Sequence, residues 1–415
     1  MRINTGKGTI SLLTLIAIYS VPIVKSLPGL AVGPILGSLQ NVFKGASDLE
    51  LQMLESLPSF IIIPFVLLSG RLSMRWSEKK LLLLGMGLFV LSSVLFLLAD
   101  SMTFLLVNSC LLGIGAGIVI PLAPGLVAEY FAGKRRTQQL GISSSISNLS
   151  LVLATLLAGF LADLGWRYPF LVYCLSIISF VFAFFLGPAP KGEPAKAATT
   201  AEPGDTAPII KKWPLGLMAF YFFATLIAVI IPFNLSLYLE SFHLGSSGLA
   251  GTLNSVFFLA IMFPGFILTP IIRAGKFSTN FLALALMTVG LLMFLVTHSL
   301  WLLGLGTICI GFGYGIIQPL VYDKTSDRVA PNRVTFALSL VVVMNYVAID
   351  LHPFYIELLE KIFHTHSPYL PFIANLIATA AVAAYAFFRR RSSGIIGMKY
   401  YASLMKEEEV ETDKK

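Results

Sequence analysis

The sequence predicts an all-α membrane protein with twelve transmembrane helices in two pseudo-symmetric six-helix halves. Hydrophobic residues make up 56% of the 415-residue chain, charged residues make up 12%, and the mean hydropathy is +0.84. A soluble domain needs more charge to cover its surface, so a lipid bilayer is the expected environment. The chain also repeats itself: Gly113–Leu122 reads GIGAGIVIPL, and Gly311–Leu320, 198 residues later, reads GFGYGIIQPL. An internal repeat within apolar sequence is typical of secondary transporters.

Apolar runs of about 20 residues, each able to cross ~30 Å of hydrocarbon as a helix, follow one another along the chain. There are twelve: residues 9–30, 50–69, 81–99, 103–127, 138–162, 168–187, 214–237, 248–272, 278–297, 301–321, 334–352 and 368–388. A long polar connection rich in proline, alanine and charge separates the sixth run from the seventh and is typical of a flexible linker. The predicted domains are therefore a first half at 1–187, a linker at 188–213, a second half at 214–391 and a tail at 392–415.

Lysine and arginine are unevenly distributed among the connections. On the side of the N-terminus, the connections and both ends of the chain hold 25 of the 29. Positive residues accumulate on the cytoplasmic side of membrane proteins, so we expect both termini in the cytoplasm and a multi-pass protein of the inner membrane. The net charge of +8 reflects this topology, and we expect no nucleic-acid partner. We expect the protein to be a monomer.

Motifs for other activities do not occur in the sequence. It has no Gly-Lys-Ser/Thr nucleotide loop, no G-x-S-x-G elbow and no H-E-x-x-H helix. The three cysteines lie far apart within apolar runs, which argues against a disulfide framework or a metal cluster. We therefore expect neither an enzyme nor a bound metal or cofactor.

The connection between the second and third runs, GRLSMRWSEKKLLLLG at Gly70–Gly85, resembles the signature G-x-L-a-D-R-x-G-R-K of the major facilitator superfamily. Four positions match the signature: Gly70, Leu72, Arg75 and Lys79. Three depart from it, standing where the family usually has Asp, Gly and Arg: Met74, Ser77 and Glu78. The resemblance extends over essentially the whole chain and implies the twelve-helix fold, alternating access and transport of small solutes.

A second match is GWRYPF at Gly165–Phe170, which is common in the drug-exporter branch of that family. Two other exporter signatures are degenerate. Ser109 stands where that branch has an Arg, and of the antiporter motif G-x-x-x-G-P-x-x-G-G only Gly159 remains.

Three ionisable residues lie within apolar runs and are candidates for substrate or proton binding: Lys25, Glu55 and Asp350. At 1.5 Å per residue they lie about 24, 22 and 25 Å from the inner face. An unpaired charge in hydrocarbon costs about 2.5–3.5 kcal/mol, so each should face a partner or water. Alternatively, Lys25 reaches the outer interface, Glu55 starts a helix near water, and Asp350 ends one at the surface.

Uncharged polar residues inside the apolar runs are further candidates for contacts with a solute. They are Asn254, Gln318 and Asn345, together with Tyr314, which lies within the second glycine block. Their alternative role is to join helices by hydrogen bonds, each typically worth ~0.6 kcal/mol.

The glycine blocks are expected to bring helices close together and let them slide, with a proline bend shortly after each block. An acid–arginine pair follows each block and suits an inner gate. The residues predicted to have gating or structural roles are Gly70, Arg75, Gly113, Gly117, Pro121, Glu129, Arg135, Gly311, Gly315, Pro319, Asp327 and Arg333.

The leading hypothesis is a secondary active transporter that exports a small organic solute in exchange for protons by alternating access. The alternative is uptake or facilitated diffusion of an organic anion, with Lys25 as the anion contact. A lipid flippase or a non-transporting receptor on the same fold is a weaker hypothesis.

Overall fold

A computed structural model describes residues 2–28, 31–32, 39, 42–43, 48–162, 164–190, 212–244, 247–327, 329–365, 367–392 and 396–398. The chain divides into two compact units. Unit 1 consists of Met1–Ala132, Ile146–Ala198 and Thr325–Val343. Unit 2 consists of Gly133–Ser145, Thr199–Lys324 and Met344–Lys415.

The chain begins with a small β-hairpin and not with a helix. Strands β1 (Arg2–Asn4) and β2 (Thr9–Ser11) pair antiparallel. The hydroxyl of Ser11 accepts a hydrogen bond from the backbone N–H of Thr14 at 3.1 Å, which caps helix α1 (Leu12–Lys25). The first helix therefore starts three residues later than predicted, because residues 9–11 are used in the hairpin.

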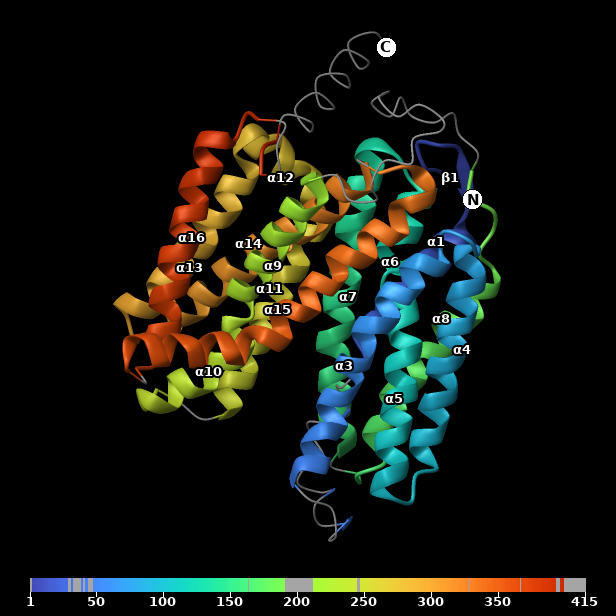
Figure 1. Cartoon of the computed structure of the whole chain (residues 1–415), viewed down its shortest axis with the longest axis horizontal. Coiled ribbons are helices and arrows are strands. Elements are labelled where there is room, and N and C mark those ends of the chain that lie inside the picture. The colour runs from blue at the N-terminus through green and yellow to red at the C-terminus, as the bar shows by residue number, and fades with distance from the viewer. Residues whose placement is uncertain are drawn as a thin grey trace. The chain divides into compact units, whose positions relative to one another are not determined.

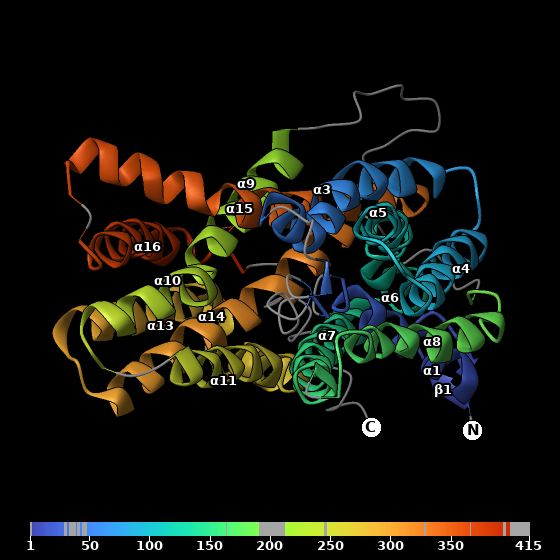
Figure 2. The ribbon, with the colours of Figure 1, turned by 90° about the horizontal axis from the view of Figure 1, so that it is seen from below.

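The other helices of unit 1 are α3 (Asp48–Leu72), α4 (Glu78–Leu97), α5 (Met102–Val119), α6 (Leu122–Tyr130) and α8 (Leu175–Phe184), with the 3-10 helix η2 (Tyr168–Cys174). Helix α5 packs between α3 and α4, and α8 packs between α4 and α1 (Figure 2). In the core, the rings of Phe96 and Phe170 stack with their centroids 4.6 Å apart, and both side chains are buried. This aromatic contact joins α4 to η2.

The helices of unit 2 are α9 (Lys212–Ala228), α10 (Ile230–Ser241), α11 (Ser247–Phe266), α12 (Leu268–Gly275), η3 (Lys276–Ser278), α13 (Thr279–Val296), α14 (Leu300–Asp327) and α16 (Leu370–Arg389). Helices α13 and α16 run side by side (Figure 1). Between them the rings of Phe294 and Phe372 stack with their centroids 4.8 Å apart. The hydroxyl of Tyr238 donates to the Phe294 carbonyl at 2.5 Å, which satisfies the polar end of this buried aromatic side chain.

Two long helices contribute to both units. Helix α7 (Gly133–Ala162) belongs to unit 2 as far as Ser145 and to unit 1 from Ile146. Helix α15 (Val334–Phe363), preceded by η4 (Pro331–Arg333), belongs to unit 1 as far as Val343 and to unit 2 from Met344. The N-terminal part of α7, which comes from the first half of the sequence, therefore belongs to unit 2. The N-terminal part of α15, which comes from the second half, belongs to unit 1.

Among the described residues, nine helices are long and apolar enough to cross a membrane. Three shorter apolar helices accompany them: Leu12–Lys25, Ser56–Leu72 and Tyr168–Phe184. Every predicted apolar run overlaps a described helix, and α15 continues 11 residues past its predicted end to Phe363. Large apolar side chains such as Trp301 and Phe388 are 90% and 82% exposed, which suits contact with lipid. Twelve crossings and the four domain boundaries stay predictions.

Candidate functional site

A cluster of buried tyrosines occupies the interior of unit 2. Tyr314 and Tyr322 lie two turns apart on α14, with Gln318 midway between them, so all three face the same side of that helix. The hydroxyl of Tyr221 on α9 lies 3.3 Å from that of Tyr314 and 3.2 Å from that of Tyr322. The Gln318 amide donates to the Tyr221 hydroxyl at 2.9 Å. One phenol therefore gathers three hydrogen-bond partners in an environment that excludes water.

Two further helices complete this cluster. The amide of Asn345 on α15 donates to the Tyr314 hydroxyl at 3.0 Å and to that of Thr225 at 3.1 Å. Thr225 itself lies 3.1 Å from the Tyr314 hydroxyl. From α7, the Ser144 hydroxyl donates to the Gln318 side-chain oxygen at 2.5 Å. These seven residues, hereafter the tyrosine cluster, bring together α7, α9, α14 and α15.

The carboxyl group of Asp350 lies farther along α15. It interacts electrostatically with Tyr346, which precedes it by one helical turn and follows Asn345 of the tyrosine cluster. One carboxyl oxygen, Oδ2, is buried and accepts no hydrogen bond from the described residues. Nearby on the same helix, His352 is buried, and its Nε2 lies 2.7 Å from the side-chain nitrogen of Asn234 on α10.

The other predicted binding residues belong to other helices, α1, α3 and α11. Lys25 is half-buried in the last turn of α1 in unit 1, and the next residue, Ser26, donates to the Ser147 carbonyl at 2.8 Å. Asn254 lies on α11 in unit 2, and its side-chain oxygen is buried without a donor among the described residues. Glu55 lies on α3, but its side chain is outside the described part of the chain. Among the predicted residues whose side chains the structure describes, Tyr314, Gln318 and Asn345 meet in one hydrogen-bond network.

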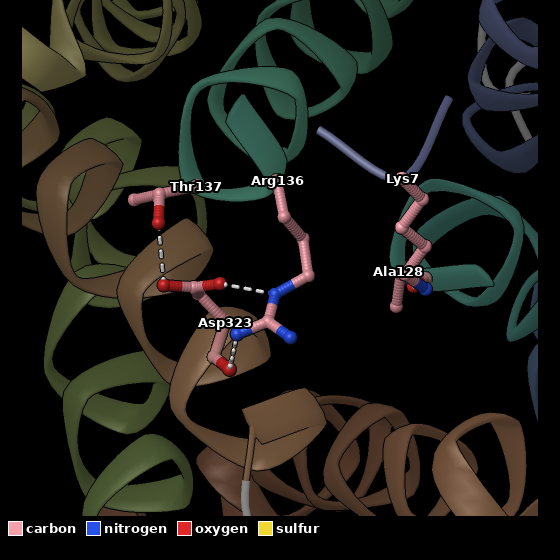
Figure 3. A network of polar contacts seen from close by, with 5 residues as sticks. All are labelled: Lys7, Ala128, Arg136, Thr137 and Asp323. Atoms are coloured by element: carbon pink, nitrogen blue, oxygen red, sulfur yellow. Dashed lines mark hydrogen bonds and ion pairs between the residues drawn. The ribbon is translucent and has the colours of Figure 1, made fainter. Parts of the chain in front are cut away.

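A buried ion pair joins the first turn of α7 to the last turns of α14 within unit 2 (Figure 3). Arg136 Nε donates to Asp323 Oδ1 at 2.7 Å, and Thr137 donates its hydroxyl hydrogen to Asp323 Oδ2 at 2.6 Å. Asp323 is fully buried and Arg136 is 9% exposed. Because both carboxylate oxygens are satisfied, this contact differs from the weak exposed pairs found on protein surfaces.

The residues of the predicted gate pairs are Glu129, Arg135, Asp327 and Arg333. Arg135 is exposed, whereas the next residue, Arg136, points inward to Asp323, one helical turn before Asp327. Glu129, at the end of α6, contacts the side chain of Glu78. Arg333 forms the end of η4. The sequence repeat alone did not show Arg136 and Asp323, because the helical phase at the start of α7 selects which arginine faces inward.

The glycine blocks bring helices into close backbone contact. A Cβ atom at Gly113 or Gly117 would lie 2.9 Å from the Pro58 carbonyl oxygen or 2.7 Å from Phe65 Cβ, both on α3. Equivalent atoms at Gly311 and Gly315 would lie 2.7 and 2.4 Å from carbonyl oxygens of α11. The same positions of the two repeats therefore pack α5 on α3 and α14 on α11.

The two block prolines differ in their effect. Pro121 stands between α5 and α6, where the helix breaks. Pro319 lies inside the continuous helix α14. The bend predicted for both repeats therefore coincides with a helix break only in the first.

The signature connection forms a second polar contact, in unit 1. Glu78, at the start of α4, accepts a hydrogen bond from the Thr335 hydroxyl at the start of α15. Gly70 packs against Ser339 on α15, and the Arg75 side chain is exposed. Lys79 donates to the carbonyls of Phe184 and Leu186, both at 2.8 Å.

Comparison with known proteins decides the family. The model of the Major Facilitator Superfamily matches residues 11–349. The chain belongs to this superfamily. Members of the Major Facilitator Superfamily are transporters, so the chain is a multi-pass membrane transporter and not an enzyme.

Relatives and solved structures agree with this assignment. The quinolone resistance protein NorA of Staphylococcus aureus is 24% identical over 320 residues, covering 74% of this chain and 80% of NorA. The crystal structure of the human organic anion transporter MFSD10 superposes with a TM-score of 0.71 at 15% identity, covering 91% of this chain and 99% of that one. The proton:xylose symporter XylE gives a TM-score of 0.67 at 14% identity, covering 93% and 98%. At these identities, the two solved structures show the fold alone.

Proposed function

We propose that this transporter exports small organic solutes from the cytoplasm in exchange for protons, as a monomer in the inner membrane with both termini in the cytoplasm. The similarity to NorA, whose name records quinolone resistance, supports the direction of transport. The excess of lysine and arginine in the connections on the side of the N-terminus supports the orientation.

The tyrosine cluster is the proposed solute site, and it is the observation that carries the proposal. Its members supply phenol, amide and hydroxyl groups but no full charge. In the first repeat, the residues equivalent to Tyr314, Gln318 and Tyr322 are Ala116, Ile120 and Pro124, so the polar stripe is specific to the second half. The rings of Tyr221 and Tyr314 are nearly parallel, with their centroids 6.3 Å apart. Stacked rings with hydrogen-bonding groups suit a neutral or weakly charged aromatic solute.

Asp350 is the proposed proton carrier. Its buried Oδ2 has no donor among the described residues, so ionisation leaves a poorly solvated charge unless water or a cation arrives. The acid interacts with Tyr346, which in turn interacts electrostatically with Tyr322 of the cluster. Loss or gain of one proton at Asp350 therefore changes the electrostatic surroundings of the solute site, which is the linkage that exchange requires.

Alternating access needs contacts that break and re-form at the two faces of the membrane. We assign this role on the cytoplasmic side to the contact of Arg136 and Thr137 with Asp323. The closely packed glycines of α5 and α14 provide smooth surfaces for helix sliding.

The test of this proposal uses everted membrane vesicles and a fluorescent quinolone as the first probe. A proton gradient that is acidic inside the vesicles should drive uptake of the quinolone, because protons leave the lumen as the solute enters. This uptake corresponds to export from the cell, and collapse of the gradient should abolish it. Replacing Asp100, which forms an exposed ion pair with Arg167, by Asn should leave uptake unchanged. If the uptake rates of a panel of aromatic solutes are the same with and without the imposed proton gradient, proton coupling is contradicted.

Transport of an organic anion is a second candidate, and it rests on Lys25. This cation lies half-buried within an apolar helix that contains Pro22. A positive charge at this depth is expected to face an anion or water. If Lys25→Met abolishes flux of anionic solutes and spares neutral ones, the anion is the substrate. If the flux of anionic solutes is the same in Lys25→Met and in the unmodified protein, Lys25 is not the anion contact.

A further inference from the structure

Two acidic side chains meet at the start of α4 in unit 1. Glu129 lies one helical turn after Gly125 on α6, and a Cβ atom at Gly125 would lie 3.3 Å from Oε1 of Glu78 on α4. The two acidic side chains interact electrostatically. Two ionised carboxylates at close range repel each other and cannot hydrogen-bond, so one proton shared between the two acids stabilises the pair.

The surroundings of Glu78 show where that proton lies. Its Oε1 accepts the hydroxyl hydrogen of Thr335. Its Oε2 is buried and receives no hydrogen bond from an N–H or hydroxyl donor among the described residues, although it belongs to the side chain that contacts Glu129. A proton on Oε2 that is donated to Glu129 satisfies both oxygens of Glu78. Protonated Glu78 therefore bridges α6 and α15.

The groups around the pair favour this distribution of charge. Lys7, from the turn of the N-terminal hairpin, donates to the carbonyls of Ala128 and Glu129 at 3.1 and 2.8 Å, and its charge acts on the Glu129 carboxylate. Tyr130 on α6 interacts electrostatically with both acids. The charge of Lys7 opposes the desolvation of the Glu129 carboxyl group, whereas no N–H or hydroxyl donor among the described residues reaches Glu78 Oε2, so the proton resides on Glu78.

A glycine permits the close approach of α15. A Cβ atom at Gly125 on α6 would lie 2.7 Å from the Thr335 hydroxyl and 3.3 Å from Glu78 Oε1. Thr335 therefore reaches Glu78 only because position 125 has no side chain.

We infer that Glu78 and Glu129 form a proton-binding site that latches the first turn of α15 while the proton is shared and releases it when the proton leaves. After deprotonation, Glu129 can turn to solvent, but Glu78 then holds a negative charge on a buried oxygen. That charge is hydrated only if Glu78 leaves Thr335, which opens the contact between α4 and α15.

The latch gives the transporter a response to pH that is separate from Asp350. With the proposed orientation, the site faces the cytoplasm, so an alkaline cytoplasm releases α15 and an acidic one holds it. One linked proton changes the ratio of released to latched protein by at most about tenfold per pH unit. The inference uses the proposed function only to say which compartment sets the pH.

Hydrogen–deuterium exchange of the full chain in detergent micelles tests the site without requiring transport. Protection factors corrected for the intrinsic pH effect should fall for residues 334–339 between pH 6 and pH 8, by at most about tenfold per pH unit for one linked proton. Residues 136–141 are the internal control, because Thr137 there contacts an acid paired with a fixed cation, Arg136. Equal changes for the two segments would overturn the inference.

Substitutions separate proton sharing from a general loosening of the fold. In Glu129→Gln, the amide donates to ionised Glu78, and in Glu78→Gln the amide donates to Glu129 while its oxygen accepts from Thr335. Both variants should keep residues 334–339 protected at pH 8. Glu357→Gln, at an exposed acid paired with Lys361, is the matched control and should retain the wild-type response. A wild-type pH response in both Gln variants at positions 78 and 129 would also overturn the inference.

Discussion

Thr137 and Thr335 lie 198 residues apart, at the same position of the two repeats. Each lies near the start of a long helix and donates its hydroxyl hydrogen to a carboxyl group of another helix. The surroundings of the two acceptors differ. Asp323 is held by the fixed charge of Arg136, whereas Glu78 faces a second acid, Glu129. One repeat therefore closes with an ion pair and the other with a shared proton.

Removing the cation of the buried ion pair should strongly destabilise unit 2. Arg136→Met leaves the fully buried Asp323 without its charge partner, and we expect a loss of about 3–5 kcal/mol in the free energy of unfolding. Denaturation of the purified protein in mild detergent measures this loss. The exposed pair of Arg167 and Asp100 is the control, and Arg167→Met should cost less than about 1 kcal/mol. Equal losses for the two variants would contradict the structural weight given to Arg136.

Removing one phenol oxygen from the tyrosine cluster should weaken solute binding and preserve the fold. Tyr314→Phe deletes a group that contacts Thr225, Tyr221 and Asn345. One hydrogen bond contributes about 0.5–1.5 kcal/mol, so we expect KM for the exported solute to rise about two- to tenfold. Initial rates in everted vesicles measure the change. Tyr385→Phe, at a tyrosine that is 54% exposed, should leave KM unchanged.

Close helix packing at the glycine blocks should be intolerant of even one methyl group. In Gly315→Ala the new Cβ would lie 2.4 Å from a backbone carbonyl oxygen of α11, and such overpacking typically costs about 1–3 kcal/mol. A Cβ at Gly251, also on α11, would meet no atom within 4 Å, so Gly251→Ala should be neutral or stabilise the helix by up to about 1 kcal/mol. If Gly315→Ala and Gly251→Ala change the melting temperature by the same amount, packing at Gly315 does not limit stability.

Enlarging Gly125 should open the contact between α4 and α15 at every pH. The methyl group of Gly125→Ala would displace the Thr335 hydroxyl from Glu78, because only 2.7 Å separates the new Cβ from that oxygen. Protection of residues 334–339 against exchange should then be low at both pH 6 and pH 8. High protection at pH 6 in this variant would mean that Thr335 does not need the space at Gly125.

The helices and the family followed from the sequence, because apolar length and the 198-residue repeat are local properties of the chain. The tyrosine cluster followed only in part. The spacing of Tyr314, Gln318 and Tyr322 on one helical face was visible in the sequence and would have identified Tyr322. Tyr221 was not predictable, because it meets these residues only when α9 packs against α14.

The gate residues show a different limit. The repeat pointed to Arg135 through its counterpart Arg333, yet the first turn of α7 directs Arg136 toward Asp323. A repeat aligns positions along the chain, but the start of each helix sets which side chain faces inward. Glu78 was visible as a departure from the family signature, whereas its contact with Glu129 depends on how α4 packs against α6.

Gradient-driven export in the Asp350→Asn variant is the most direct test of proton-coupled transport. In everted vesicles with an acidic lumen, this variant should lose the uptake driven by protons leaving the vesicle, while it still exchanges labelled for unlabelled solute across the membrane. Asn cannot bind and release the proton that Asp350 carries in the proposed cycle. The substitution should leave solute binding and alternating access intact. Full gradient-driven uptake by Asp350→Asn would contradict the account.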